Sequence, residues 1–139
     1  MAGTDYEILV SDESIPVDGI GQHYQVFVGT PGSANNVIFT APFRMSIHSP
    51  WASWETVSGN TNVAKLARID DGETKSASPT DMVSDTLNVN AGANTRNSWT
   101  LDTDENILEE GDRIELDLSN APNNLAEVIV GFYGTPIIG

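Results

Sequence analysis

Cysteine is absent from this 139-residue sequence, and basic residues are scarce. Without cysteine the chain has no disulfide framework and no cysteine-based zinc or iron–sulfur site, so a hydrophobic core or a partner must provide its stability. Only 6 Lys and Arg stand against 20 Asp and Glu, which gives a formal net charge of -14 at pH 7. An acidic surface of this kind repels phosphate backbones and anionic lipids. We therefore expect no nucleic acid and no membrane as partners.

Long apolar runs and helical periodicity are also lacking. No apolar stretch reaches the length of a membrane-spanning helix, and the N-terminus has no basic region followed by an apolar run. We therefore expect a protein without a secretory signal, made and assembled in the cytoplasm of the cell that produces it. The acidic balance is most simply explained by solubility. Salt adaptation is the alternative, favoured by the scarcity of lysine, which occurs only at Lys65 and Lys75.

The clearest strand signal follows a turn at residues 110–112. Gly111 can adopt a positive φ without steric cost, which favours a tight turn here. After this turn, Ile114, Leu116 and Leu118 alternate strictly with charged residues. This is the pattern of a strand with one buried and one solvated face, and such a strand needs a partner sheet.

Other short segments with strand patterns are separated by Gly, Pro, Asn and Asp. Segment 62–70 fits a short helix almost as well as a strand, and we favour the strand because nearby glycines limit its length. The expected strands cover 6–10, 23–28, 37–39, 43–47, 62–70, 87–89, 99–101, 113–118 and 125–133. Eight or nine short strands predict an all-β fold, a single-domain antiparallel β-sandwich that is jelly-roll-like.

Two regions are expected within this domain organisation. Residues 1–22 form an N-terminal arm or first strand plus a loop, and residues 23–139 form the β-sandwich domain. We expect segment 51–60 to be a loop or an edge. The strands at 87–89 and 99–101 are expected to lie around a turn at 90–94.

Catalytic motifs are not evident. The only imidazoles belong to His23 and His48, each beside apolar residues on an expected strand, and the default role of both is a surface or interface polar group. No G-x-S-x-G or H-E-x-x-H motif is present. Serine is so common here that its co-occurrence with histidine indicates nothing about a triad. We expect that the protein is not an enzyme.

Acidic residues at short spacing are candidates for a cation site. Segment 102–106 begins like an EF-hand loop, but Ile107 replaces the required glycine and Arg113 replaces the bidentate glutamate. This segment and segment 70–73 are therefore expected to be solvated turns. With 20 acids in the chain, paired carboxylates suited to glycoside hydrolysis occur at almost any separation and carry no specificity. We expect no metal and no cofactor.

The tryptophans give the best binding hypothesis from the residues alone. Trp51 and Trp54, with Trp99 elsewhere in the chain, could form a stacking platform for a sugar ring. Tryptophan is more often a core residue or an anchor in a protein interface. A carbohydrate- or receptor-binding module is therefore an alternative function, and a core or interface role is the more common one.

Two stretches together resemble a known group of proteins. Residues 39–43, Phe-Thr-Ala-Pro-Phe, lead into Met45 and Ile47 and are similar to the "TAPFxGxI" opening of small β-sandwich virion proteins of tailed bacteriophages. Residues 100–118 are similar to their later "TLxxDxxLxxGDxIxLxL" segment, and an apolar strand at 125–133 closes the domain. Here Arg44-Met45-Ser46 replaces the usual glycine-containing turn. Over about residues 36 to 133 the chain thus resembles capsid decoration (cement) or head-fibre domains.

This resemblance implies a structural virion protein that binds the outer surface of a phage capsid and stabilises the shell. The implied partner is the major capsid protein, the implied oligomer is a homotrimer, and the implied location is the capsid exterior after assembly in the host cytoplasm. Tyr6, Ile8 and Val10 are the candidate strand for addition to a neighbour. Trp51 and Trp54 complete the set of candidate partner contacts.

Overall fold

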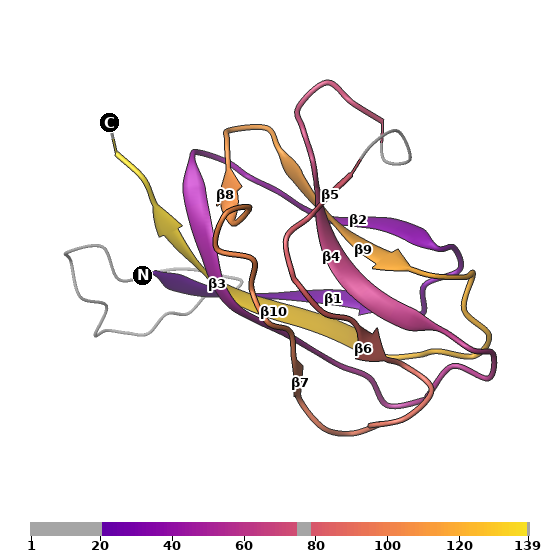
Figure 1. Cartoon of the computed structure of the whole chain (residues 1–139). Coiled ribbons are helices and arrows are strands. Elements are labelled where there is room, and N and C mark those ends of the chain that lie inside the picture. Colours follow the sequence, from indigo (N-terminus) through magenta and orange to yellow (C-terminus); the bar gives the residue numbers. More distant parts are fainter. Residues whose placement is uncertain (1–20, 75–78, 139) are drawn as a thin grey trace.

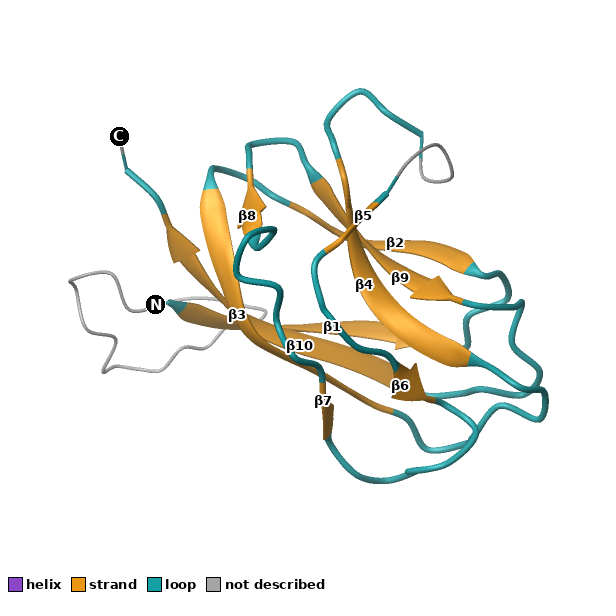
Figure 2. Ribbon diagram, in the orientation of Figure 1, coloured by secondary structure: helices purple, strands orange, loops and turns teal. Residues whose placement is uncertain are grey.

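The computed structural model describes residues 21–74 and 79–138, and these residues form ten β-strands and no helix (Figures 1 and 2). Accordingly, nothing in the described ranges is a helix that could cross a membrane. The strands are β1 Gln22–Gly29, β2 Asn35–Thr40, β3 Met45–Ser53, β4 Val63–Ile69, β5 Thr80–Asp81, β6 Leu87–Asn88, β7 Asn97–Ser98, β8 Ile107–Leu108, β9 Arg113–Leu118 and β10 Val128–Pro136.

The strands form two antiparallel five-stranded sheets packed face to face. Sheet A has the order β1-β10-β3-β7, with β8 also paired to β3, and sheet B has the order β2-β9-β4-β5, with β6 also paired to β4. Strands that follow each other in the chain occupy equivalent positions in opposite sheets. This holds for β1 and β2, for β3 and β4, and for β9 and β10. This wrapped arrangement is a jelly roll, which confirms the predicted fold class.

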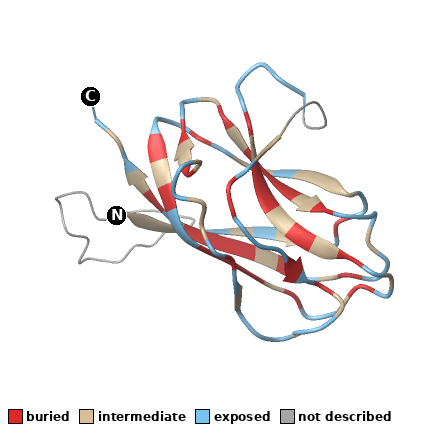
Figure 3. Ribbon diagram, viewed as in Figure 1, coloured by how far each residue is buried: buried red, intermediate tan, exposed pale blue. Residues whose placement is uncertain are grey.

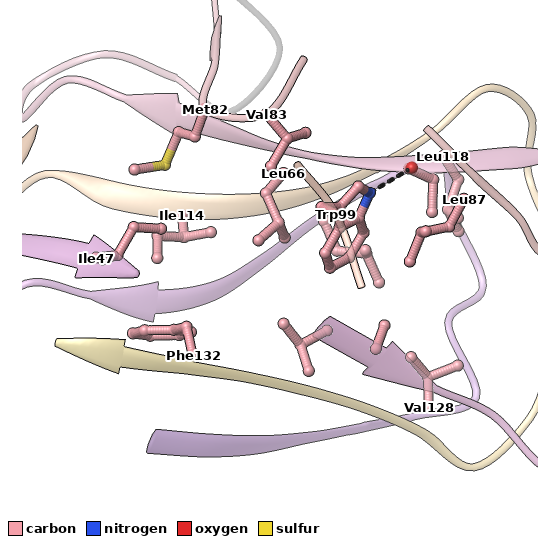
Figure 4. Packing of buried hydrophobic residues seen from close by; sticks show 14 of the residues in the cluster. Ile47, Leu66, Met82, Val83, Leu87, Trp99, Ile114, Leu118, Val128 and Phe132 are labelled. Carbon is pink, nitrogen blue, oxygen red and sulfur yellow. Dashed lines mark hydrogen bonds between the residues drawn. The ribbon is translucent and has the colours of Figure 1, made fainter. Parts of the chain in front are cut away.

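The core lies between the sheets because alternate residues of each strand point inward. Val128, Val130 and Phe132 of β10 are 2%, 0% and 0% exposed, and they belong to one core cluster with Ile114 and Leu116 of β9. Figure 4 shows this packing around Trp99, whose Nε1 donates to the Ala64 carbonyl at 2.9 Å. Figure 3 shows the buried stripe that runs through both sheets.

The turn at 110–112 is hydrogen-bonded to residue 41, so it connects two of the stretches that carry the phage-protein resemblance. Gly111 has a φ of 91°, as the sequence predicts for a tight turn. Its N–H donates to the Ala41 carbonyl at 2.9 Å, and the Ala41 N–H donates to the Asp112 carbonyl at 2.8 Å. The buried Asp112 carboxylate accepts from the N–H groups of Asp71 and Glu109 at 2.9 and 2.8 Å. The Ala-Pro and Gly-Asp segments are therefore one structural unit.

Several sequence predictions can now be compared with the strands. The ambiguous segment 62–70 is a strand, β4, as favoured. Ten strands are found among the described residues instead of eight or nine because four of them have only two residues. The expected strand 87–89 is found as β6, which pairs with β4 in sheet B. The expected strand 99–101 is not found: the strand on that side of the turn is β7 at 97–98, which pairs with β3 in sheet A, and Leu101 makes only an isolated bridge with Val83.

Segment 51–60 also differs from its prediction. Residues 51–53 lie within β3, an interior strand of sheet A between β10 and the short strands β7 and β8, so this part is neither a loop nor an edge. Residues 54–60 lie between β3 and β4, outside both strands, as predicted for a loop. Segment 6–10, with the candidate contacts Tyr6, Ile8 and Val10, lies outside the described residues. At the start of the described domain Gln22 pairs with Gly134 of β10, so both ends of the domain lie at the same end of the sandwich (Figure 1).

Candidate functional site

The three long strands of sheet A are free of formally charged side chains. β1, β3 and β10 contain no Asp, Glu, Lys or Arg, although the chain has 20 acids. In sheet B, β2 is also uncharged, but β4 and β9 carry charged residues such as Lys65, Arg113 and Asp117. The acidic character is therefore distributed unevenly, and sheet A presents a neutral outer surface.

This outer surface of sheet A is rich in aromatic side chains. Because Tyr24 and Val28 pack on the core, the alternate residues His23, Gln25 and Phe27 of β1 point outward. We call the outward-pointing set His23, Phe27, Trp51, Ile129 and Tyr133 the aromatic face. In register, His23 lies opposite Tyr133 and Phe27 lies opposite Ile129. Phe27 is 66% exposed and Tyr133 is 45% exposed, so the face offers large apolar groups to a partner.

Trp51 occupies the centre of the aromatic face. It lies opposite Gly131 of β10, and its indole ring covers the place where a Cβ at position 131 would stand. The absence of a side chain at Gly131 thus allows the ring to lie across the strand. Trp51 is only 8% exposed.

Neighbouring groups hold the indole in place. The guanidinium carbon of Arg96 lies 4.4 Å from the Trp51 ring centroid, in a cation–π contact. The indole Nε1 donates to Nε2 of His23 at 3.3 Å, and the two rings stack with centroids 6.0 Å apart and an interplanar angle of 18°. The His23 and Tyr133 centroids are 4.7 Å apart. His23, Trp51, Arg96 and Tyr133 therefore form one connected cluster.

The environment of His23 favours its neutral form. Burial lowers the pKa of His23, and the nearby positive charge of Arg96 lowers it further. Geometry agrees with this direction, because Nε2 accepts the indole hydrogen bond and must be unprotonated to do so. At neutral pH His23 is therefore neutral and adds no charge to the aromatic face.

His48 also lies on the outer surface of sheet A. It pairs in register with Tyr133 and its Nε2 is 2.9 Å from Oγ of Ser46. Within the described residues neither His23 nor His48 has a hydrogen bond to a carboxylate, so the Ser46–His48 pair lacks the orienting acid of a triad there. The arrangement suits a polar group at an interface.

The other two tryptophans belong to the core. Trp54 is 2% exposed and its Nε1 donates to the Ala91 carbonyl at 2.9 Å, while Trp99 is 5% exposed. Both rings are buried in this fold, although Trp54 also lines the hollow beside Trp51. A sugar platform made of all three tryptophans is not formed.

An open hollow lies beside Trp51. It has a volume of about 390 Å³ and is lined by Trp51, Ser53, Asn94, Arg96 and Glu127, among others. Two of these residues, Asn94 and Glu127, have positive φ values of 60° and 57°. The hollow combines amide, carboxylate and guanidinium groups with two tryptophans, Trp51 and Trp54.

The acidic segments behave as turns. Asp102 accepts the Asp104 N–H at 3.0 Å through its carboxylate, and the Glu105 N–H donates to the Asp102 carbonyl at 3.0 Å. The Glu73 N–H donates to the Asp70 carbonyl at 3.0 Å in the same manner. Across residues 21–74 and 79–138, no group of three or more His, Asp or Glu side chains could hold a metal ion.

Sequence analysis missed several residues of this cluster. Arg96, Gly131 and Tyr133 come from two separate segments, and only the fold brings them to Trp51. A usable signal existed in the charge pattern, because the three strand segments without charge could have been recognised as one surface. Arg96 gave no such signal.

Comparison with known proteins gives little further guidance. No family model matches the chain, and no curated protein matches it. Among solved structures, the chain is similar to one described as "Structure of infectious bursal disease virus Gx strain", with 12% sequence identity and a TM-score of 0.40. The match covers 96% of this chain and 40% of that chain, so the chain spans less than half of its neighbour's length. The assignment of a jelly roll therefore rests on the strand order itself.

Proposed function

We propose that the protein is a structural component of a virus particle, and that it binds the outer surface of a tailed-phage capsid through the aromatic face. The neutral aromatic face on an otherwise strongly acidic jelly roll is the observation that carries this proposal. The jelly roll supports it as well, because this architecture is used by viral capsid domains, although lectin domains use it too. Residues 36 to 133 resemble phage decoration domains, and this resemblance is the reason for proposing a tailed-phage capsid as the particle.

The chemistry of the aromatic face suits a protein partner. Cores of protein interfaces are depleted in charged residues and enriched in aromatic residues and arginine. Phe27 and Tyr133 supply exposed aromatic area, and Arg96 with Trp51 supplies a prearranged pair. A capsid surface can cover these groups without removing carboxylates from water, which would be costly.

The acidic remainder of the surface then sets the orientation of the bound protein. Carboxylates on sheet B and the loops would lose hydration if they were buried against the major capsid protein, so the aromatic face is the favoured contact. Many copies that each bury a modest interface would strengthen the shell through their number, since every contact must be broken when the shell ruptures.

Co-sedimentation with empty heads of the phage that encodes the chain tests this proposal. Tyr133→Asp places a charge on the aromatic face and should reduce binding at least about tenfold, because an unpaired carboxylate would be buried. Val37→Asp is the matched control, since Val37 is 39% exposed, comparable with Tyr133 at 45%, but lies on sheet B. Equal binding by both variants, with both folded by circular dichroism, would contradict a contact through the aromatic face.

The carbohydrate-binding alternative is supported by the hollow beside Trp51. Titration with oligosaccharides would change the tryptophan fluorescence if a sugar displaced Arg96 from the indole ring. The same titration with Trp51→Phe identifies the responding ring. A saturable change that disappears in Trp51→Phe, in a protein that does not sediment with heads, would favour this second function.

A further inference from the structure

Within residues 21–74 and 79–138, the edges of the two sheets are protected on one side of the sandwich and not on the other. On one side the sheets end in β5, β6, β7 and β8, each of which has only two residues. On the other side sheet A ends in the eight-residue β1 and sheet B ends in the six-residue β2. Very short edge strands prevent pairing with another chain, whereas long ones invite it.

Strand β1 has no feature that would discourage pairing. It contains no proline and no formally charged residue, and Gln25 and Phe27 point outward and are exposed. β10 pairs with one side of β1, and no other strand of the described ranges pairs with its second side. Lysine and proline are the usual means of blocking such an edge, and β1 has neither.

Regular geometry distinguishes β1 from β2 as a pairing edge. Residues Gln22 to Phe27 pair with β10 in unbroken register, and the irregularity between Phe27 and Gly29 lies at the end of the strand. The irregularity in β2 falls between Val37 and Phe39, in the middle of a shorter strand. A bulge interrupts the hydrogen-bond ladder and bends the strand, so the more regular β1 is the better edge for pairing with another strand.

Charge decides which partner this edge can accept. Two copies of a chain with a net charge of -14 repel each other wherever their acidic surfaces meet. At β1 that local repulsion is absent, because neither β1 nor its neighbours β10 and β2 contain Asp, Glu, Lys or Arg. A pair related by a two-fold axis places the same surface against itself, which requires a self-compatible surface. A neutral antiparallel edge satisfies this requirement.

We propose that β1 pairs antiparallel with β1 of a second copy of this chain, about a two-fold axis. The two copies of sheet A then form one continuous sheet with β1 strands at its centre, and the two aromatic faces lie on the same side of it. This inference concerns self-association and does not depend on what the aromatic face binds. It also differs from the trimer implied by the phage-protein resemblance.

Solution mass as a function of protein concentration is the first test. Native mass spectrometry or sedimentation velocity should show a monomer and a dimer, and Gln25→Lys should raise the dissociation constant of the dimer about tenfold, because like charges would face each other across the strand pair. Gln25→Ser is the matched control and should dimerise like the natural chain. Added salt should strengthen the dimer by screening the acidic surfaces. A monomer at every concentration, or a trimer, would overturn the proposal.

Spin labelling locates the contact, and the absence of cysteine makes it simple. A label on Gln25→Cys should give a short distance between the two copies, whereas a label on Ser98→Cys, in β7 at the opposite edge, should give a long one. The reverse pattern would show that another surface mediates the dimer and would overturn the proposal. The two proposals can fail separately. A dimer that does not bind capsids would contradict the proposed function only, and a monomer that binds capsids would contradict this inference only.

Discussion

At the residue scale, His23 connects the chemistry of the aromatic face with pH. Its pKa in the folded protein is lowered by burial and by Arg96, relative to the ordinary value of about 6.5. A group with a lowered folded pKa contributes stability that is present above the unfolded pKa and is lost as the pH falls through the folded pKa. Protonation of His23 below about pH 6.5 should therefore lower the free energy of unfolding.

The pH prediction is tested by comparing His23→Gln with the natural chain. The free energy of unfolding of the natural chain should decrease between about pH 7 and about pH 5, and the decrease should be smaller in His23→Gln. Urea unfolding at each pH measures both values. Gln25→Ser on the same strand is the control and should show the natural slope. Parallel pH profiles of His23→Gln and the natural chain would contradict a role for His23.

Some residues were predictable from the sequence and others were not. The positive φ of Gly111 follows from its place in a turn, and the structure confirms it. Glu115 was assigned to a solvated face because it alternates with Ile114 and Leu116, but it is 0% exposed. Its Oε2 accepts a hydrogen bond from Nδ2 of Asn35 at 2.7 Å. Alternation predicts which face of a strand a residue occupies, but it does not show what covers that face.

At the element scale, the close approach of β3 and β10 depends on Gly131. A Cβ at position 131 would stand inside the Trp51 ring, so Gly131→Ala must displace the indole from its place across the strand. We expect a loss of about 1–3 kcal/mol in the free energy of unfolding, as for other overpacked sites. Tryptophan emission should also shift to the red as Trp51 becomes more exposed.

Urea unfolding and fluorescence measure these two effects of Gly131→Ala. Gly32→Ala is the matched control, because a Cβ at Gly32 would meet no atom within 4 Å. This control should change the free energy of unfolding by no more than about 0.5 kcal/mol. If both variants had the same stability and the same emission as the natural chain, Gly131 would not be what holds Trp51 in place.

Strand existence was easier to predict than strand pairing. The alternation in β1, β9 and β10 identified these strands and their core-facing residues, since each repeats apolar residues at every second position, although β10 begins and ends three residues later than predicted. The strands on either side of the turn at 90–94 were expected without partners, and the structure places β6 in sheet B and β7 in sheet A. Partners in a jelly roll are far apart in sequence, and short-range patterns carry no information about them.

At the scale of the whole molecule, charge is separated from the aromatic face. The net charge of -14 resides on sheet B, the loops and the terminal segments, and self-repulsion among these carboxylates destabilises the compact state. The arrangement of the aromatic face was not predictable, because its residues come from three strands that are far apart in the sequence, although the lack of charge in those strands was visible. Only the fold shows that β1, β3 and β10 lie side by side in one sheet.

Screening this self-repulsion should stabilise the protein. Raising the ionic strength from about 0.01 M to about 0.15 M shortens the Debye length from about 30 Å to about 8 Å. We expect the melting temperature to rise over this range, as measured by circular dichroism with NaCl. Sucrose of matched osmolality is the control for effects that do not depend on charge. A melting temperature that falls with salt would indicate that attractive ion pairs outweigh the repulsion.

The pairing of Gln22 with Gly134 brings the beginning and the end of the domain to the same end of the sandwich. A domain with adjacent ends can be inserted into a loop of another protein, or its ends can be joined and new ends opened in an exposed loop such as 90–94. Cargo fused to either end would emerge at that same end of the roll. The domain is thus a candidate carrier for displaying peptides or folded tags with one defined direction of attachment.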